Sequence, residues 1–382
     1  MYTAESISSL FPDGTHILPD PQAPVRQVCI DSRKAAWQPQ AIFLALQGAR
    51  ADGHRYIQDA WNQGVRSFLV QEQIDLTQLP EGNFIRVPNV IEAFHVLAAH
   101  HRDNYTGKVV AIIGSNGKTW VKEWLYMLMY RDLSVYRSPG SYNSQVGVPL
   151  SVWNIPLETS YAIIEAGISS PGEMIKLQKI IRPDIVVFTH FGDAHDEGFG
   201  GDIHAKLSEK LIMCTDDTSI VFPHDQLLVY DTIRKSFPDK FQFTWSMHGL
   251  GLINGSAEKK GDVSHVTVQF EDKQYEYPLP FTGIVPVSNS LVCLTTFVAL
   301  GIPIESRLKG FEDLQPIDMR LKAEDGIQGC VLINDSYSLD LDSLQYALES
   351  LDIAGQTQQK TLILSDHAYG RPGCLLYTSR CV

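Results

Sequence analysis

The sequence lacks an excess of basic residues and lacks long apolar runs. Its 31 lysines and arginines are outnumbered by 44 aspartates and glutamates, which gives a formal net charge of −13. This balance argues against general binding to nucleic acid or to an anionic membrane surface. No apolar run approaches the ~20 residues that a membrane-spanning helix needs. We therefore expect no nucleic-acid partner and no membrane insertion, whereas small anionic ligands stay possible because local clusters of charge decide their binding.

Paired cysteines are also absent. The six cysteines are scattered and show no C-x-x-C spacing. Most lie in apolar stretches such as "QVCI" and "GCVLI", where a buried free thiol is expected. The first residues, "MYTAESISSLFPDG", show no basic segment followed by an apolar one, so no secretory signal is predicted. These features predict a cytoplasmic protein without disulfides or structural zinc.

The 382 residues are enough for two or three domains. Residues 1–106 contain short strand-like runs and close with the helical pattern "VIEAFHVLAAHHRDNY". Residues 107–303 alternate strands, such as "VVAIIG" and "DIVVFTH", with helices, which indicates βαβ units and a mostly parallel sheet covered on both faces. Residues 304–382 predict a helix, the strand "CVLINDSY", a helix and the strand "TLILSD", too few elements for a complete doubly wound domain. The chain is thus predicted to be α/β with an incomplete C-terminal domain.

The segment "VVAIIGSNGKTWVKEWL" predicts a strand, a turn and a helix. Gly114 and Gly117 let backbone N–H groups approach an anion, Lys118 can reach outer phosphates, and Thr119 can offer a hydroxyl to Mg²⁺. In an open parallel sheet, ligands bind beyond the carboxyl ends of the strands, where this turn lies. The match to G-x-x-x-x-G-K-[ST] is imperfect, because Ile112 takes the place of the first glycine. The segment predicts a nucleoside triphosphate site; the alternative is a strand–turn–helix with a surface lysine.

Other polar residues follow strands at the same predicted edge. Glu165 ends the strand "YAIIEAG" and suits a Mg²⁺ ligand, although a solvated glutamate is the alternative. His195, in "FTHFGDAHDEGFGG", could bind a metal through its neutral imidazole or could be structural. The sequence alone does not rank its neighbours His190, Asp193, Asp196 and Glu197.

Two further candidates for binding an anionic ligand lie near the C-terminus. Arg320 occurs in "DMRLK", and Asp335 and Tyr337 occur in "INDSYSLD", just after a predicted strand. Each is unremarkable alone, since Arg320 could be a solvated charge and Asp335 a helix or turn cap.

Six motifs in this order resemble those of the Mur ligases, the ATP-dependent amide ligases of peptidoglycan precursor synthesis. "GSNGKT" resembles the family's G-T-N-G-K-T loop, and "DSRKAAWQPQAIFLALQGARADGHRYI" resembles its D-S-R…F-x-A-L-x-G…D-G-H pattern. "GSYNSQVGVPLSVW", "IIEAGISSPGEMIKL", "RPDIVVFTHFGDAH" and "INDSYSLDLDSLQYAL" resemble four more. The resemblance implies three domains: a small N-terminal α/β domain that binds the UDP-substrate (1–106), a central P-loop ATPase-like domain that binds ATP (107–303) and a truncated Rossmann-like C-terminal domain (304–382).

Within the family, the resemblance is strongest to the ligases that add D-alanyl-D-alanine to UDP-N-acetylmuramoyl-tripeptide, especially the version fused to an alanine racemase. It implies that ATP phosphorylates the tripeptide's terminal carboxylate, that the amine of D-alanyl-D-alanine attacks the acyl phosphate, and that Mg²⁺ is required. It also implies a racemase as a fused or separate partner. Two alternatives stay open: the ligase that forms the tripeptide by adding diaminopimelate or lysine, and a truncated fragment that binds nucleotide without turnover.

The resemblance also implies roles for individual residues. The phosphates would be bound by the loop residues Gly114, Ser115, Asn116, Gly117, Lys118 and Thr119. Thr119 and Glu165 would bind one Mg²⁺, and His195 would bind a second together with a carbamylated lysine, assigned to Lys210 with Lys206 as the alternative. Adenine, phosphate and ribose would be contacted by Asn289, Arg320 and Asp335. The uridine-nucleotide side would be lined by Ser32, Arg33, Asp52, Gly53 and His54, with Asn143 and Gln145 nearer the peptide.

Overall fold

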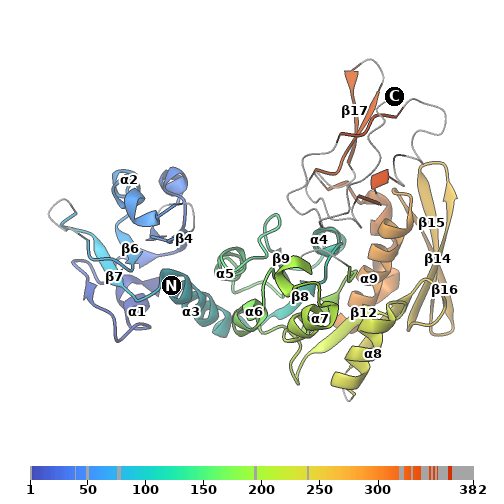
Figure 1. Cartoon of the computed structure of the whole chain (residues 1–382), viewed down its shortest axis with the longest axis horizontal. Helices are drawn as coiled ribbons and strands as arrows, with labels where there is room; N and C mark the ends of the chain where they lie inside the picture. The colour runs from blue at the N-terminus through green and yellow to red at the C-terminus, as the bar shows by residue number, and fades with distance from the viewer. Residues whose placement is uncertain are drawn as a thin grey trace.

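The computed structural model (Figure 1) describes residues 2–38, 40–48, 51–74, 79–192, 196–238, 241–317, 322–327, 330–336 and short segments at 344–345, 347–348, 351 and 360–363. A five-stranded sheet lies in the N-terminal part of the chain and a nine-stranded sheet in the middle. The predicted α/β class, with a large and mostly parallel central sheet, is confirmed. The predicted domain boundaries stay predictions; they fall between the last helix of the N-terminal part and the first central strand, and after the last long helix.

The N-terminal sheet is buried on both faces. Its strands, from edge to edge, are β2 (His16–Ile17), β7 (Asn83–Arg86), β6 (Ser67–Val70), β5 (Ala41–Leu44) and β4 (Gln27–Cys29). All pair in parallel except β2. One face packs on α1 (Ala4–Ser8) and α3 (Val90–Asp103). The other packs on η1 (Ser32–Trp37) and α2 (Ile57–Asn62), with η2 (Gly53–Tyr56) leading into α2. Continuous apolar strands such as "AIFL" are typical of this double burial. A short pair, β1 (Tyr2–Thr3) and β3 (Pro24–Val25), lies outside the sheet.

The central sheet places its phosphate-loop strand between two parallel neighbours. Its order is β16 (Lys273–Leu279), β15 (Val263–Phe270), β14 (Ile253–Lys260), β13 (Gln242–Ser246), β12 (Ser219–Pro223), β11 (Ile185–Phe188), β8 (Lys108–Ile113), β10 (Tyr161–Glu165) and β9 (Val135–Arg137). Every pair from β9 to β14 is parallel, and β14, β15 and β16 form an antiparallel extension. The residues that follow β8, β10 and β11 therefore meet at one edge.

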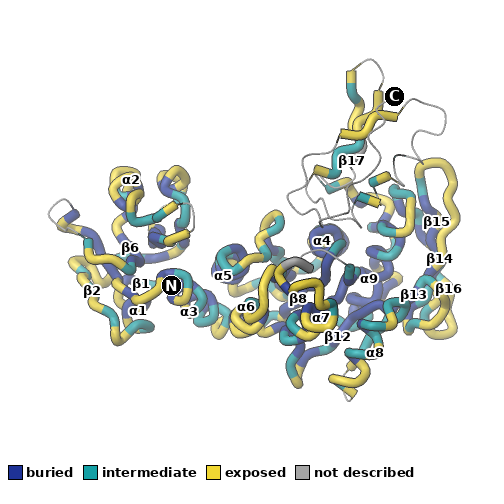
Figure 2. Tube along the Cα trace, in the orientation of Figure 1, coloured by how far each residue is buried: buried dark blue, intermediate teal, exposed yellow. Residues whose placement is uncertain are grey.

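Helices cover both faces of the central sheet. One face carries α4 (Lys118–Met129) and α9 (Ile284–Leu300). The other carries α5 (Gly147–Trp153), α6 (Glu173–Ile181), α7 (Ile203–Leu211) and α8 (Leu227–Ser236). Figure 2 shows that α4 and α9 are largely buried. The remaining elements are η4 (Asp196–Phe199), η5 (Ile304–Ser306), η6 (Leu308–Asp313) and the antiparallel pair β17 (Lys322–Asp325) and β18 (Val331–Asn334).

Helix α3 joins the two sheets. It belongs to the N-terminal core through Phe94 and Leu97 and also contacts α5 and α6. The guanidinium of Arg102 donates to the carbonyl oxygens of Ile181 and Arg182, both at 2.9 Å. Helix α3 thus packs on both the N-terminal part and the central part of the chain and connects them.

Several local expectations were wrong. Residues 361–363, the described part of the predicted strand "TLILSD", form no strand, and the helix expected after Pro303 is replaced by η5 and η6. Cys330 is exposed, whereas Cys29, Cys214 and Cys293 are buried as expected. Among the residues that the structure describes, no helix is long and apolar enough to cross a membrane.

Candidate functional site

The loop between β8 and α4 has a backbone that only glycine adopts easily at two positions. The φ angles of Gly114 and Gly117 are 138° and 84°. A Cβ on Gly114 would lie 2.2 Å from Thr189 Oγ1, and a Cβ on Gly117 would lie 2.8 Å from Asn289 Oδ1. The Nζ of Lys118 donates to the carbonyl oxygens of Gly114 at 3.1 Å and Ser115 at 2.7 Å. The loop is therefore tightly wound, with a nearly buried ammonium folded over it.

A buried carboxylate lies beside the first turn of α4. Glu165 ends β10 and is 1% exposed. Thr119 Oγ1 donates to its Oε2 at 2.9 Å, and Asn143 Nδ2 donates to its Oε1 at 2.7 Å. Ser141 Oγ lies 3.2 Å from Thr119 Oγ1. The structure thus brings together three of the residues that the sequence assigned to the metal and peptide side of the site.

These residues fit a magnesium ion and a nucleotide. Thr119 and Glu165 supply a hydroxyl and a carboxylate, the oxygen ligands that Mg²⁺ prefers. A carboxylate as buried as Glu165 is costly unless a cation or hydrogen bonds compensate it. On the α9 side, the Nδ2 atom of Asn289 is buried and has no hydrogen-bond partner among the described residues, although its Oδ1 faces Gly117. A donor without a partner beside a phosphate loop suits a polar ligand.

Lysine 122, which the sequence reasoning missed, also contacts this cluster. Its side chain is fully buried, and its Nζ lies 3.8 Å from Glu165 Oε2 and 3.2 Å from Glu123 Oε1. Burial lowers the pKa of this ammonium, while the charges of Glu165 and Glu123 oppose that shift. Its spacing from Thr119 was the available signal, because residues three apart share one face of a helix.

Two lysines of α7 reach different parts of the site. Lys210 Nζ donates to the carbonyl oxygen of Gly114 at 3.0 Å. Lys206 Nζ donates to the carbonyl oxygen of Gly192 and lies 4.9 Å from the centre of the Phe191 ring. Both side chains are buried. Lys210 therefore contacts the phosphate loop, and its predicted role as a carbamylated metal ligand stays a prediction.

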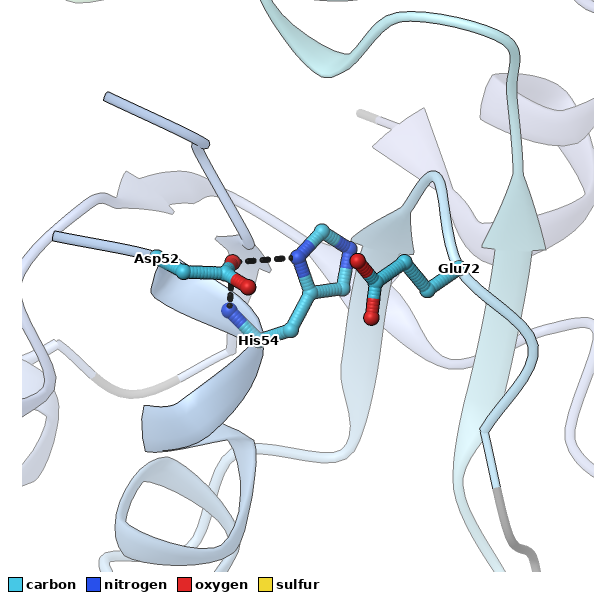
Figure 3. A group of neighbouring side chains, drawn as sticks. All are labelled: Asp52, His54 and Glu72. Atoms are coloured by element: carbon cyan, nitrogen blue, oxygen red, sulfur yellow. Dashed lines mark hydrogen bonds and ion pairs between the residues drawn. The ribbon is translucent and has the colours of Figure 1, made fainter. Parts of the chain in front are cut away.

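The N-terminal motifs lie in η1 and η2, beside the N-terminal sheet. Asp52 caps η2, and His54 Nδ1 donates to Asp52 Oδ1 at 2.7 Å (Figure 3). The His54 Nε2 atom accepts from the backbone N–H of Gln71 at 3.1 Å, which assigns the proton to Nδ1. Asp52, His54 and Glu72 are close enough to hold a metal ion, but both ring nitrogens of His54 already have partners. The hydrogen bonds from His54 lower the pKa of Asp52.

The other predicted residues on this side follow the neighbouring strand. Ser32 is buried at the start of η1, which follows β4, whereas η2 follows β5; the two motifs therefore share one edge of the parallel sheet. The guanidinium of Arg33 pairs with Asp31 at 2.8 Å and lowers the pKa of that carboxyl. Gly53 packs closely against the backbone of Leu46, because a Cβ at position 53 would lie 2.7 Å from the Leu46 nitrogen.

The remaining predicted residues are placed as follows. Asn116 forms an isolated bridge with His190, and Thr189 Oγ1 donates to the Asn116 carbonyl oxygen at 2.6 Å. Gln145 Nε2 donates to the Glu173 carbonyl oxygen at 3.1 Å, beside α6. Asp335 follows β18 and is partly exposed. His195, Arg320 and Tyr337 lie outside the described residues.

We expect Gly117→Ala to weaken ATP binding at least about tenfold, a change of roughly 1.4 kcal/mol. Alanine is strained at a φ of 84°, and its methyl group would displace Asn289. Calorimetric titration of ATP measures the loss. Gly172→Ala is the matched control, because Gly172 has a φ of 80° with nothing within 4 Å of a Cβ. Equal ATP affinity in both variants would contradict the role assigned to the loop.

Known proteins similar to this chain include members of one family of ligases. Residues 112–297 match the model of the Mur ligase middle domain, and residues 24–103 match that of the Mur ligase family, catalytic domain. Over 319 residues, 81% of this chain and 69% of the relative, the sequence is 30% identical to UDP-N-acetylmuramoyl-tripeptide--D-alanyl-D-alanine ligase of Rickettsia prowazekii. The chain belongs to the Mur ligase family. The family expected from the motifs is thereby confirmed.

Solved structures show the same fold for this Mur ligase. The crystal structure of MurF from Acinetobacter baumannii superposes with a TM-score of 0.82 at 24% identity, over 92% of this chain and 76% of that one. MurF from Thermotoga maritima, solved in complex with ADP, gives a TM-score of 0.74 at 23% identity, over 86% and 74% of the two chains. The Mur ligase architecture expected from the sequence is confirmed.

Proposed function

We propose that the chain is an ATP-dependent ligase that joins D-alanyl-D-alanine to UDP-N-acetylmuramoyl-tripeptide. The observation that carries the proposal is the grouping of Lys118, Thr119 and Glu165, which combines a phosphate loop with a buried carboxylate at one edge of the sheet. The names of the relatives support the choice of substrates. The ADP bound to a structural neighbour supports the choice of nucleotide.

The reaction proceeds by two successive nucleophilic displacements. A terminal carboxylate oxygen of the tripeptide attacks the γ-phosphorus of ATP, the bond to the bridging oxygen breaks, and ADP leaves. The amine of D-alanyl-D-alanine then attacks the carbonyl carbon of the acyl phosphate, loses a proton and expels inorganic phosphate. Lys118 and the N–H groups of the loop hold the phosphates in line and offset their charge, so catalysis is mainly positioning and charge neutralisation.

The proposed metal ligands are divided between two positions. Thr119 and Glu165 would hold one Mg²⁺, whose chemistry is to neutralise the phosphate charge. His195 and a carbamylated Lys210 would hold a second ion. Addition of CO₂ to the Lys210 Nζ, with loss of two protons from the ammonium, would turn a buried cation that touches the loop into an anionic oxygen ligand.

The remaining roles are those that the resemblance to the family implies. Asn289 and Arg320 would contact adenine and phosphate and Asp335 the ribose, while Asn143 and Gln145 would face the peptide. The uridine nucleotide would lie along the N-terminal sheet at Ser32, Arg33, Asp52, Gly53 and His54. A cytoplasmic location and an alanine racemase partner, fused or separate, complete the proposal.

Release of ADP by the purified chain tests this function. We expect release only when Mg-ATP, UDP-N-acetylmuramoyl-tripeptide and D-alanyl-D-alanine are all present, as shown by omitting each in turn. Release that instead requires the dipeptide precursor with diaminopimelate or lysine would identify the tripeptide-forming ligase. Binding of ATP and UDP-tripeptide without release would reject turnover and leave a nucleotide-binding fragment.

A further inference from the structure

Lys122 is a buried cation that the proposed reaction does not use. It lies in α4 one turn beyond Thr119, and its side chain is fully buried. Its described polar contacts are with Glu123, Glu165 and the carbonyl oxygen of Gly140. Burying an ammonium group costs free energy unless nearby anions and hydrogen bonds compensate the charge. The groups that surround the Lys122 ammonium must therefore supply this compensation.

The charges around Lys122 balance. Glu165 is 1% exposed and Glu123 is 13% exposed. The Nε of Arg137, in β9, donates to Glu123 Oε2 at 2.6 Å, so two cations face two anions. Arg137 pairs directly with Glu123, and Lys122 forms an ion pair with Glu165 at 3.8 Å. Without the Lys122 ammonium, the buried Glu165 carboxylate would keep, among the residues described, only hydrogen bonds from the neutral side chains of Thr119 and Asn143.

Lys122 also holds the segment that completes the site. Its Nζ donates to the carbonyl oxygen of Gly140, within residues 138–146. This segment carries Ser141, which contacts Thr119, and Asn143, which donates to Glu165. One side chain therefore joins α4, β10 and the loop after β9.

We propose that Lys122 is the counter-ion of Glu165 when no magnesium is bound, and that it anchors residues 138–146 beside this carboxylate. The inference rests on the proposed function in one respect, the assignment of Glu165 to Mg²⁺. Mg²⁺ brings its own positive charge to the carboxylate, so Lys122 and the metal neutralise the same group. Lys122 is thus a positioning residue whose charge competes with Mg²⁺.

This competition predicts an unusual variant. Lys122→Met should lower the midpoint of thermal unfolding in metal-free buffer by roughly 5–10 °C, since breaking a buried ion pair leaves one charge uncompensated. MgCl₂ should restore most of this loss, whereas NaCl of equal ionic strength should not. The Mg²⁺ concentration that restores half of the lost stability should be about tenfold lower than the concentration that gives half of the wild-type shift in the unfolding midpoint. The reason is that a cation near the metal has been removed.

Two controls separate charge from packing. Lys108→Met removes an exposed lysine that pairs with Asp184 on the same sheet, and its response to Mg²⁺ should equal that of wild type. The double variant Lys122→Met/Glu165→Gln should be more stable in metal-free buffer than Lys122→Met alone, because it removes the carboxylate that lost its counter-ion. This comparison applies even if the single variant folds poorly.

The outcomes distinguish the inference from the proposed function. A Lys122→Met variant with the same loss of stability at every Mg²⁺ concentration, or a double variant no more stable than the single one, would overturn the counter-ion role. Wild-type protein that releases ADP with its co-substrates, beside either of those results, would leave the ligase function standing. Wild-type protein with neither ADP release nor a response to Mg²⁺ would reject the proposed function itself.

Discussion

Replacing Lys118 by methionine is expected to lower the rate of ADP formation about a thousandfold, the scale typical of removing one preorganised group that stabilises developing charge. The ammonium is nearly buried and is held over the loop by the carbonyl oxygens of Gly114 and Ser115. It is therefore placed before any phosphate arrives. Methionine keeps most of the length of the side chain but removes the ammonium, with its charge and its N–H donors, so the loss should lie in turnover with Mg-ATP.

Two measurements make this result specific to the phosphate loop. Binding of the UDP-tripeptide should be little changed in Lys118→Met, because the motifs assigned to its uridine nucleotide lie in η1 and η2, beside the N-terminal sheet. Lys179→Met, at an exposed position of α6, should keep the wild-type rate. A Lys118→Met variant that retains a tenth of the activity would show that this lysine does not stabilise the transferred phosphate.

The second large effect is on stability. Trp124→Ala should reduce the free energy of unfolding by about 3–5 kcal/mol, the range for truncating a large buried aromatic side chain. Trp124 is 0% exposed in the core between α4 and the sheet. Its ring meets Trp120 edge-to-face at 5.0 Å and stacks on Phe281 at 5.3 Å. Urea unfolding of the purified chain measures the change.

Trp124→Phe is the matched variant for this test. It keeps an aromatic ring against Phe281 and removes the indole N–H, which has no hydrogen-bond partner among the described residues. We expect it to lose less than half as much stability as Trp124→Ala, because most of the buried apolar contact stays. Equal losses in the two variants would mean that stability depends on the full indole rather than on filling the core.

The sequence predicted the parts of the site that depend on strand order along one edge. Thr119 lies just after strand β8, and Glu165 ends strand β10. These two strands pair in parallel, so a βαβ pattern predicts that the two side chains lie close together. The choice between Lys206 and Lys210 could not be predicted in the same way. The two are four residues apart on one helix face, and what distinguishes them in the structure is the carbonyl oxygen to which each Nζ donates, that of Gly192 for Lys206 and that of Gly114 for Lys210.

Elements that break the usual patterns were missed for physical reasons. Helix α5 contains Gly147 and Pro149, which lower helix propensity, yet both lie in its first turn, where proline is tolerated. Lys122 was overlooked because a lysine in a helix normally faces solvent. It contacts Glu165 of β10 and Gly140 of the loop after β9. Both are more than fifteen residues away in the sequence, so the helix pattern alone does not reveal them.

The docking of α3 has a consequence for substrate choice. This helix is part of the N-terminal core, yet its Arg102 and His95 side chains bond to carbonyl oxygens of the central part, at Ile181, Arg182 and Gln145. The separation between the edge assigned to the uridine nucleotide and the phosphate loop is then fixed by packing. On the proposed function, a substrate anchored at one end must be long enough to bring its carboxylate to the other, so the packing of α3 is expected to set a minimum reach for the peptide.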